Sequence, residues 1–316
     1  EVPTSSGHPM SKKYPKGAFL QPAYFVIRAS DEGLNTRHAW VQRPGLLNMY
    51  GASGRPGPKR MLAEARNALA CMPDQTSALV IGVGAGQGLG AALARRFARE
   101  GLGVFVSGRT EEKLKAVAAA IRSDGGRAEA VAGDCTLAGD VSAIFDAVEA
   151  RTGSPPRLVV YNTGNNRFSP LVEMSDEFFE GLWRTCAFGA FLCGREAARR
   201  MVPAGGGTLI FTGATASLRS RPPFTAFASA KAAERAVAHG MAREFGPEGL
   251  HVAHVVIDGV IDGEQVNSRF PAIKEGLGQD GMLSIDAIAE AYWALHCQDR
   301  RAWTLELDLR PYREKF

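Results

Sequence analysis

A glycine-rich turn, set between an apolar run and an amphipathic segment, constrains the fold of this chain more than any other feature. The apolar run 78–81 (ALVI) is typical of a buried strand in a parallel sheet. Residues 91–100 carry apolar and basic side chains at the spacing of an amphipathic helix. Between these two elements lie five glycines: Gly82, Gly84, Gly86, Gly88 and Gly90.

The order of strand, glycine turn and helix predicts a dinucleotide site. Glycines let the backbone approach the pyrophosphate, and the first turn of the helix offers unpaired N–H groups and the positive end of its dipole. A flexible glycine turn without a ligand is the alternative interpretation. We favour phosphate binding because both flanking elements are present.

Composition narrows the class of protein. The chain has 316 residues, 45% of them hydrophobic, which is typical of a globular protein with a substantial core. No apolar run in the sequence approaches the roughly 20 residues of a membrane span, so we expect no transmembrane segment. Five scattered cysteines without a C-x-x-C pair argue against a disulfide framework or a zinc site, and we expect no metal.

Residues 1–77 do not resemble a domain, because prolines and glycines interrupt every candidate element in the first 60 residues. One interpretation is a solvated, disordered tail. We favour a docking arm for a protein partner, because aromatic side chains that could anchor an interface recur in it. These are Tyr14, Phe19, Tyr24, Phe25, Trp40 and Tyr50.

The net charge of +4 belongs to this extension. Residues 1–77 hold ten Lys or Arg and five Asp or Glu, a balance of +5, which leaves −1 for residues 78–316. A charge this dilute predicts no nucleic-acid partner. A basic extension that begins at Glu1 rather than Met fits a processed protein on the mitochondrial matrix side, with a cytoplasmic location as the alternative.

From residue 78 onward, predicted strands and helices alternate. Strands are expected at 78–81, 103–107, 128–132, 158–161, 207–212, 251–257 and 303–309. Helices are expected at 91–100, 111–121, 141–150, 176–201, 226–245 and 285–297. This alternation requires right-handed crossovers and predicts an α/β fold with a Rossmann-type, doubly wound parallel sheet. We therefore expect an irregular extension, 1–77, and a dinucleotide-binding domain, 78–316.

Several motifs recur along this domain at characteristic distances. They are Gly84, Gly88, Leu89 and Gly90 in the glycine turn, Asp134 after the third strand, Asn162-Thr163-Gly164 after the fourth, Lys231 in a long helix, and Asp258-Gly259 ahead of Ile261. Together they make residues 78–309 resemble the short-chain dehydrogenase/reductase family, although Val83 and Asp258 replace its usual Thr and Pro. The resemblance implies that these residues bind the cofactor, with Asp134 at the adenine and the backbone of Ile261 at the nicotinamide amide.

The end of the second strand bears on the identity of the cofactor. Proteins that read NAD place an acidic residue there, whereas the run VSGRT at 106–110 has none. The guanidinium of Arg109 could instead pair with a 2′-phosphate, which favours NADP over NAD. A solvated loop charge at Arg109 is the alternative interpretation.

The resemblance also implies a catalytic Asn, Ser, Tyr and Lys, of which only Lys231 is retained. The Tyr position falls on Phe227, the Ser position on Ala214 and the Asn position on Cys186. Phenylalanine has no proton to give, and alanine cannot hydrogen-bond a developing alkoxide. General acid–base help is worth about 10²–10⁴-fold and an oxyanion donor about 10²–10³-fold. We therefore expect Lys231 to support cofactor binding with little turnover.

Other polar groups could stand in for the lost ones. Nearby hydroxyls belong to Thr212, Thr215, Ser217 and Thr225, while Ser229 is offset on its helix and points elsewhere. We interpret His254 as a core histidine and Asp258 as a brace of its turn. Residues 262–281 occupy the family's lid position, but their polar, glycine-rich composition suggests a surface loop.

The two long helices, 176–201 and 226–245, match those that form the family's dimer interface. Small residues such as Gly189, Ala190 and Gly194 would allow close packing there, so we expect a homodimer. Packing of the same stripe inside the monomer is the alternative.

Three functions remain open. The first, which we favour, is an NADP-binding but catalytically degenerate family member, a structural or accessory subunit docked through residues 1–77. The second is an active NADP-dependent oxidoreductase of an unknown carbonyl or alcohol with a rearranged proton donor. The third is a nucleic-acid or membrane-surface binder, which the dilute charge of the extension disfavours.

Overall fold

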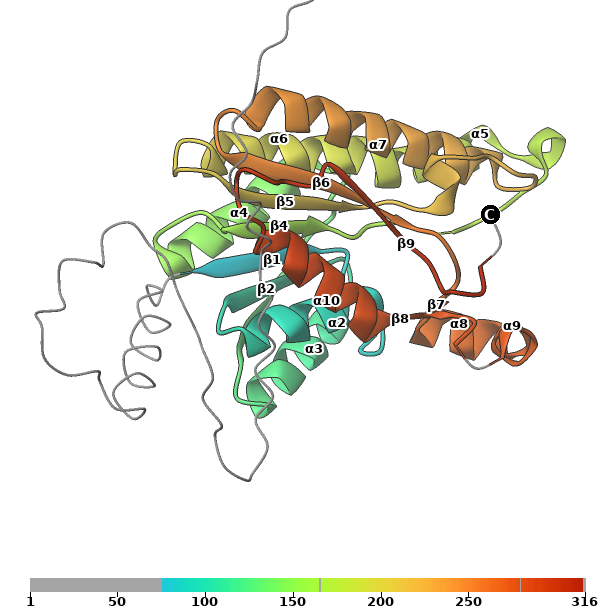
Figure 1. The fold of residues 1–316 in the computed structure, drawn as a ribbon, viewed down its shortest axis with the longest axis horizontal. Helices are drawn as coiled ribbons and strands as arrows, with labels where there is room; N and C mark the ends of the chain where they lie inside the picture. Colours follow the sequence, from blue (N-terminus) through green and yellow to red (C-terminus); the bar gives the residue numbers. More distant parts are fainter. Residues whose placement is uncertain (1–75, 165, 279, 315–316) are drawn as a thin grey trace, which may run out of the picture. The chain divides into compact units, whose positions relative to one another are not determined.

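The computed structural model describes residues 76–164, 166–278 and 280–314 (Figure 1). The chain separates into two units, Glu1–Pro58 and Lys59–Phe316, and every described residue belongs to the second. Residues 1–75 of the proposed docking arm, with all its aromatic residues, therefore lie outside the described part. The boundary at 77 is wrong by at least one residue, because Ser77 is the first residue of strand β1 and pairs with Gly103. Among the described helices, none is both long enough and apolar enough to cross a membrane.

Seven strands form one parallel sheet, in the order β3-β2-β1-β4-β5-β6-β9. Their bounds are β1 Ser77–Ile81, β2 Gly103–Gly108, β3 Arg127–Ala132, β4 Leu158–Tyr161, β5 Gly207–Thr212, β6 Leu250–Ile257 and β9 Glu306–Leu309. The strand order reverses between β1 and β4, which is the point where an open α/β sheet forms a ligand crevice. The predicted Rossmann-type doubly wound fold is confirmed.

Helices cover both faces of the sheet (Figure 1). One apolar core gathers side chains from α2 Leu89–Arg99, α3 Glu111–Ser123 and α10 Ile285–His296 against the sheet. The other gathers them from α4 Ala138–Thr152, α6 Gly189–Met201 and α7 Thr225–Phe245. Strands buried on both faces read as continuous apolar runs, which is why β1 and β4 could be located from sequence.

The predicted helix over 176–201 is interrupted. It consists of α5 Asp176–Trp183, a π-helical turn over Arg184–Phe188, and α6. Cys186, at the Asn position of the family motif, lies in this π turn and is fully buried. Single π turns occur frequently at functional sites, and the amphipathic pattern of the sequence does not reveal them.

The expectation of a surface loop at 262–281 is wrong in part. Two short helices, α8 Glu264–Arg269 and α9 Pro271–Leu277, lie there. They follow β7 Ile261–Asp262, which pairs with β8 Leu283–Ser284 in a small second sheet. Each of these two strands has two residues, which is too short for a hydrophobic periodicity to be detected in the sequence. Phe270 and Ile273 are exposed on this segment, so it also presents apolar side chains to solvent.

The last strand is shorter than predicted, because β9 begins at Glu306 rather than at Trp303. The indole of Trp303 stacks on the imidazole of His251, with ring centroids 4.8 Å apart and an interplanar angle of 5°. Trp303 therefore packs against His251 outside the strand pairing. Because Trp is also common in strands, its residue type alone does not separate a strand residue from a residue that packs beside the strand.

We expect Gly213→Ala to destabilise the protein by about 1–3 kcal/mol, because the added methyl group would overlap the buried imidazole of His254. The matched control is Gly240→Ala in α7, where an added Cβ meets nothing within 4 Å among the described residues. Replacing a helical Gly by Ala stabilises by about 0.5–1 kcal/mol. Urea unfolding measures both variants, and equal midpoints would contradict this packing.

Candidate functional site

The glycine turn after β1 has the geometry of a phosphate cradle. An added Cβ at Gly84 or Gly86 would meet no described atom within 4 Å. At Gly90 it would lie 3.0 Å from the carbonyl oxygen of Gly82, so this glycine packs α2 against the strand end. The N–H groups of Leu89 and Gly90, at the start of α2, have no hydrogen-bond acceptor among the described residues. Unpaired N–H groups at a helix start favour an anion.

The turn after β4 lies directly against the glycine turn. The side-chain amide of Asn162 donates to the carbonyl of Gly82 over 3.3 Å. Gly82 itself has φ of +96°, and an added Cβ would lie 2.6 Å from the carbonyl oxygen of Asn162. The structure thus brings together two motifs that lie 80 residues apart in the sequence.

The side chains expected at the adenine end follow β2 and β3. Arg109 is exposed just beyond β2. Asp134 is half-buried beyond β3, and its Oδ1 accepts the N–H of Thr136 over 2.9 Å, which fixes its turn. Since β3, β2 and β1 are neighbours in the sheet, both side chains lie on the same side of the crevice as the glycine turn.

Lys231 is almost completely buried, at 3% exposure. Its Nζ donates to the carbonyls of Thr163 (3.2 Å) and Thr212 (2.8 Å) and to Oε2 of Glu234 (2.8 Å). An ammonium has three N–H bonds, so all of its donors are used inside the chain. The expected contact between Lys231 and a cofactor ribose therefore requires one of these bonds to open.

Glu234 is the site residue that sequence reasoning missed. It lies one helical turn beyond Lys231 on α7 and is fully buried, and its Oε1 has no hydrogen-bond partner among the described residues. Burial raises the pKa of this carboxyl to about 7, against the opposing pull of Lys231. The available signal was a Glu three residues after a Lys on an otherwise apolar helix face.

The other three tetrad positions are apolar. Phe227 belongs to a small buried cluster with Leu182 and Cys186. Ala214 is half-buried and packs against the same cluster. An added Cβ at Gly164 would lie 3.1 Å from Cε of Lys231 and 3.9 Å from Sγ of Cys186. The four aligned positions are therefore gathered around one point, and Lys231 is the one of the four that carries a charged side chain.

Asp258 anchors a polar network near the Ala214 position. The hydroxyl of Thr215 donates to its Oδ1 over 2.5 Å, and Arg219 Nη2 bonds both oxygens, at 3.1 and 3.2 Å. Arg310 Nη2 lies 3.3 Å from Oδ2. Asp258 is buried at 2% exposure, so its interpretation as a brace of this turn agrees with these contacts.

The remaining hydroxyls that could replace the lost groups are mostly engaged. Thr212 Oγ1 accepts a hydrogen bond from Tyr292 (2.9 Å). Ser217 and Ser229 each donate back to a backbone carbonyl three residues earlier, at 2.5 and 2.9 Å. Thr215 is the hydroxyl that stands beside a buried carboxylate.

His254 is a core histidine. Its imidazole is fully buried and its Nδ1 lies 3.0 Å from Glu306 Oε2. Burial lowers its pKa to about 4, so the ring is neutral at pH 7. His239 contacts the same oxygen over 3.1 Å.

These three side chains, His239, His254 and Glu306, have their ligand atoms within 4.8 Å of one another. Arg235 already holds Glu306 with two hydrogen bonds, of 2.6 and 2.8 Å, and lowers the pKa of this carboxyl to about 2. The guanidinium supplies the positive charge that a metal ion would bring. The arrangement of His239, His254 and Glu306 is therefore that of an ion-pair network with Arg235. The four described cysteines, at positions 135, 186, 193 and 297, are free thiols.

We expect Glu234 to make stability depend on pH. Its pKa is raised in the folded state, so the folded protein binds more protons than the unfolded one between about pH 4.5 and 7. The Glu234 contribution to the free energy of unfolding therefore falls as pH rises through this range, by about 1.4 kcal/mol per unit of pKa shift.

Glu234→Gln tests this effect, because the amide keeps an acceptor for Lys231 and loses the titration. Buried histidines titrate similarly in both proteins, so the informative quantity is the difference between the two unfolding free energies. This difference should shift in favour of the variant from pH 5 to pH 8 in urea titrations. A constant difference would show that Glu234 does not titrate in this range.

Comparisons with known proteins agree with this geometry. The family model described as short chain dehydrogenase matches residues 78–272. Oxidoreductase asL5 of Sarocladium schorii is 32% identical over 199 residues, which is 63% of this chain and 75% of that protein. The short-chain reductase protein NovJ of Streptomyces niveus is 30% identical over 230 residues, which is 72% of this chain and 85% of that protein.

Solved structures show the same fold. A crystal structure of a short-chain dehydrogenase from Rhodopseudomonas palustris is 38% identical, covers 76% of this chain and 100% of its own, and has a TM-score of 0.65. A gluconate 5-dehydrogenase from Burkholderia cenocepacia, solved with NADP and tartrate, is 25% identical, with 75% and 94% covered and a TM-score of 0.67. The fold, the glycine turn and the family match together establish that this chain belongs to the short-chain dehydrogenase/reductase family.

Proposed function

We propose that this protein binds a nicotinamide dinucleotide, with NADP favoured over NAD, and supports little or no turnover. The observation that carries the proposal is the state of Lys231, whose three N–H donors are used within the chain. Around it, Phe227, Ala214 and Cys186 offer no hydroxyl or amide to a reacting oxygen. The crevice thus has groups suited to hold a cofactor, whereas the Tyr, Ser and Asn positions lack the family's hydroxyl and amide groups.

The fit of the cofactor rests on three features of the crevice. The glycine turn leaves open space beside Gly84 and Gly86 and unpaired N–H groups at Leu89 and Gly90. The end of β2 carries the cation Arg109 and no carboxylate, which suits a 2′-phosphate. The gluconate 5-dehydrogenase relative was solved with NADP.

The cofactor, when bound, supplies a hydride to a carbonyl or removes one from an alcohol. The chain must then supply or remove the matching proton. Among the aligned positions only Lys231 retains the family's residue, and its ammonium is held by Glu234 and two carbonyls. Residues that act as one unit in catalysis fail together when several are lost. The role that we propose is therefore that of a structural or accessory subunit. In this proposal residues 1–77 dock the protein to a larger assembly, which we place in the mitochondrial matrix.

A second candidate function is an active NADP-dependent oxidoreductase acting on a carbonyl or alcohol. It is favoured by the hydroxyl of Thr215, which is bonded to buried Asp258 one residue after the Ala214 position. It is also favoured by the relatives, which are named as oxidoreductases and reductases. In this alternative Thr215 takes the place of the lost donor.

Binding and turnover separate the two functions. We expect energy transfer from tryptophan to bound NADPH, together with NADPH oxidation no faster than background over a broad panel of carbonyls. Arg109→Gln should weaken NADPH binding about 10- to 100-fold, the worth of a charge-assisted hydrogen bond, and leave NADH binding unchanged. Steady turnover that is lost in Thr215→Val would favour the active enzyme.

We propose further that two copies associate through the 176–201 and 226–245 segments. Between α6 and α7 lies a groove of about 570 Å³ whose walls are mainly apolar. Phe191, 40% exposed, stands at this groove with Val237 and Phe245. A second copy of the chain is the occupant that the family resemblance implies.

Phe191→Glu should convert the homodimer to a monomer, because it places a charge in the apolar contact at a cost of several kcal/mol when desolvated. Light scattering after size-exclusion chromatography measures the mass. Glu112→Gln, an exposed change on α3 outside both segments, is the control that should leave the dimer intact. A dimer that survives Phe191→Glu would assign the stripe to packing within the monomer.

A further inference from the structure

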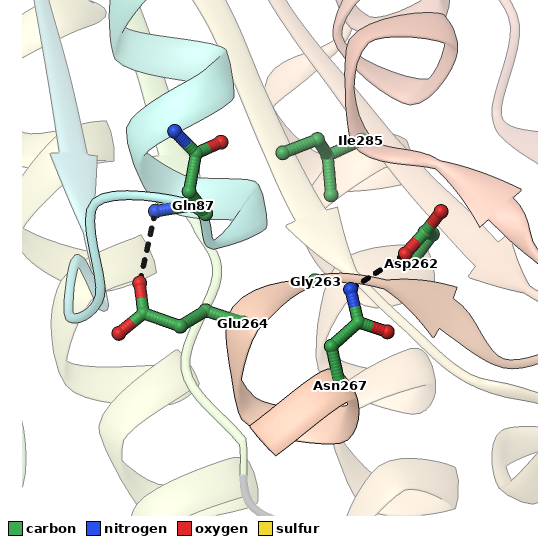
Figure 2. Close-up of a pocket in the computed structure, with 6 residues that line it drawn as sticks. All are labelled: Gln87, Asp262, Gly263, Glu264, Asn267 and Ile285. Atoms are coloured by element: carbon green, nitrogen blue, oxygen red, sulfur yellow. Dashed lines mark hydrogen bonds between the residues drawn. The ribbon is translucent and has the colours of Figure 1, made fainter. Parts of the chain in front are cut away.

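The segment from β7 to α9 is joined to the glycine turn by two reciprocal hydrogen bonds. The N–H of Glu264 donates to the carbonyl of Gln87 over 3.0 Å. The N–H of Gln87 donates to Oε2 of Glu264 over 3.2 Å. Figure 2 shows this side-chain contact at the edge of a pocket of about 320 Å³, which lies between the glycine turn and α8.

The contact places a carboxylate on the phosphate cradle. Gln87 lies between Gly86 and Gly88, two residues before the unpaired N–H of Leu89. A carboxylate and a phosphate are both anions that accept hydrogen bonds from backbone N–H groups. Glu264 therefore uses a donor of the kind that the pyrophosphate needs, and its negative charge lies close to where that pyrophosphate would enter.

The charge of Glu264 is not neutralised by a described neighbour. Asp262, on the other side of the same pocket, is held by Lys274 at 2.9 and 3.2 Å and by Asn267 at 2.7 Å. Glu264 has the Gln87 N–H as its side-chain partner and no cationic partner among the described residues. Two carboxylates, Asp262 and Glu264, thus border this pocket. Among the described residues, Asp262 is paired with Lys274, whereas Glu264 has no cationic partner.

The backbone permits this close approach at Gly263. An added Cβ there would lie 3.3 Å from the carbonyl oxygen of Gln87, which is tighter than ordinary van der Waals contact. The Glu264 side chain is exposed, so its removal leaves no cavity, and the backbone half of the contact survives any substitution of the side chain.

We propose that Glu264 is an internal competitor of the cofactor pyrophosphate and sets the affinity of the site. Entry of the dinucleotide displaces the carboxylate from the Gln87 N–H, and the α8–α9 segment moves away from the glycine turn. The inference rests on the proposed dinucleotide binding. Its ligand chemistry is that of a diphosphate, independent of the base, the ribose and the nicotinamide.

Three probes isolate the diphosphate from the rest of the cofactor. Isothermal titration calorimetry is performed with NADPH, with inorganic pyrophosphate, and with adenosine 2′-phosphate, which lacks the pyrophosphate. Glu264→Gln should tighten NADPH and pyrophosphate binding roughly tenfold, which corresponds to about 1.4 kcal/mol, and leave adenosine 2′-phosphate unchanged. Glu275→Gln, an exposed charge removal on α9, is the matched control and should change none of the three.

Movement of the α8–α9 segment is measured separately, by limited proteolysis. Trypsin can cleave after Arg269 and Lys274, both of which are exposed. Inorganic pyrophosphate should speed this cleavage in the wild-type protein, and Glu264→Gln should be cleaved faster even without pyrophosphate.

Each outcome has one meaning. Weaker NADPH binding by Glu264→Gln would mean that the carboxylate holds the segment closed over the cofactor, which overturns competition. Unchanged binding of NADPH and pyrophosphate would overturn the role of Glu264 while leaving dinucleotide binding intact. Failure of the wild type and both variants to bind NADPH and pyrophosphate would overturn the proposed function together with this inference.

Discussion

The buried ammonium of Lys231 ties together the parts of the molecule on which the site depends. Through the carbonyls of Thr163 and Thr212 it connects the ends of β4 and β5 to α7, and through Glu234 it is paired within its own helix. Burying a lone ammonium costs several kcal/mol, so these three acceptors are what allow the lysine to remain at 3% exposure. The aligned catalytic positions surround this charge and contribute only apolar surface.

A common theme links the two glutamates of the site. Glu234 holds the cation expected at the cofactor ribose, and Glu264 accepts from an N–H expected to serve its phosphates. In both places a carboxylate of the chain occupies a group that a dinucleotide would use. Binding must therefore exchange internal hydrogen bonds for cofactor ones, and only the difference in free energy appears as affinity.

The comparison with relatives separates fold from chemistry. The doubly wound strand order and the glycine turn, which are the backbone features of the family described above, are both present. These features depend on glycines and on buried apolar runs. The reactive groups are single side chains that can change without disturbing the sheet, so membership of a family of oxidoreductases does not by itself establish the activity of this chain.

The sequence alone determined the α/β class, the sheet with its helices, and the place of the glycine turn between the first strand and its helix. It could do so because buried parallel strands and amphipathic helices leave local patterns, and because Gly90 and Lys231 stand at fixed distances in known motifs.

Only the tertiary structure decided how the polar groups pair. The contacts of Glu234 with Lys231, Asp258 with Arg310, and Glu264 with Gln87 depend on side-chain direction and on loops brought together by the sheet. The π turn at Cys186 and the helices α8 and α9 depend on packing against distant elements, because neither carries a periodic signal of its own.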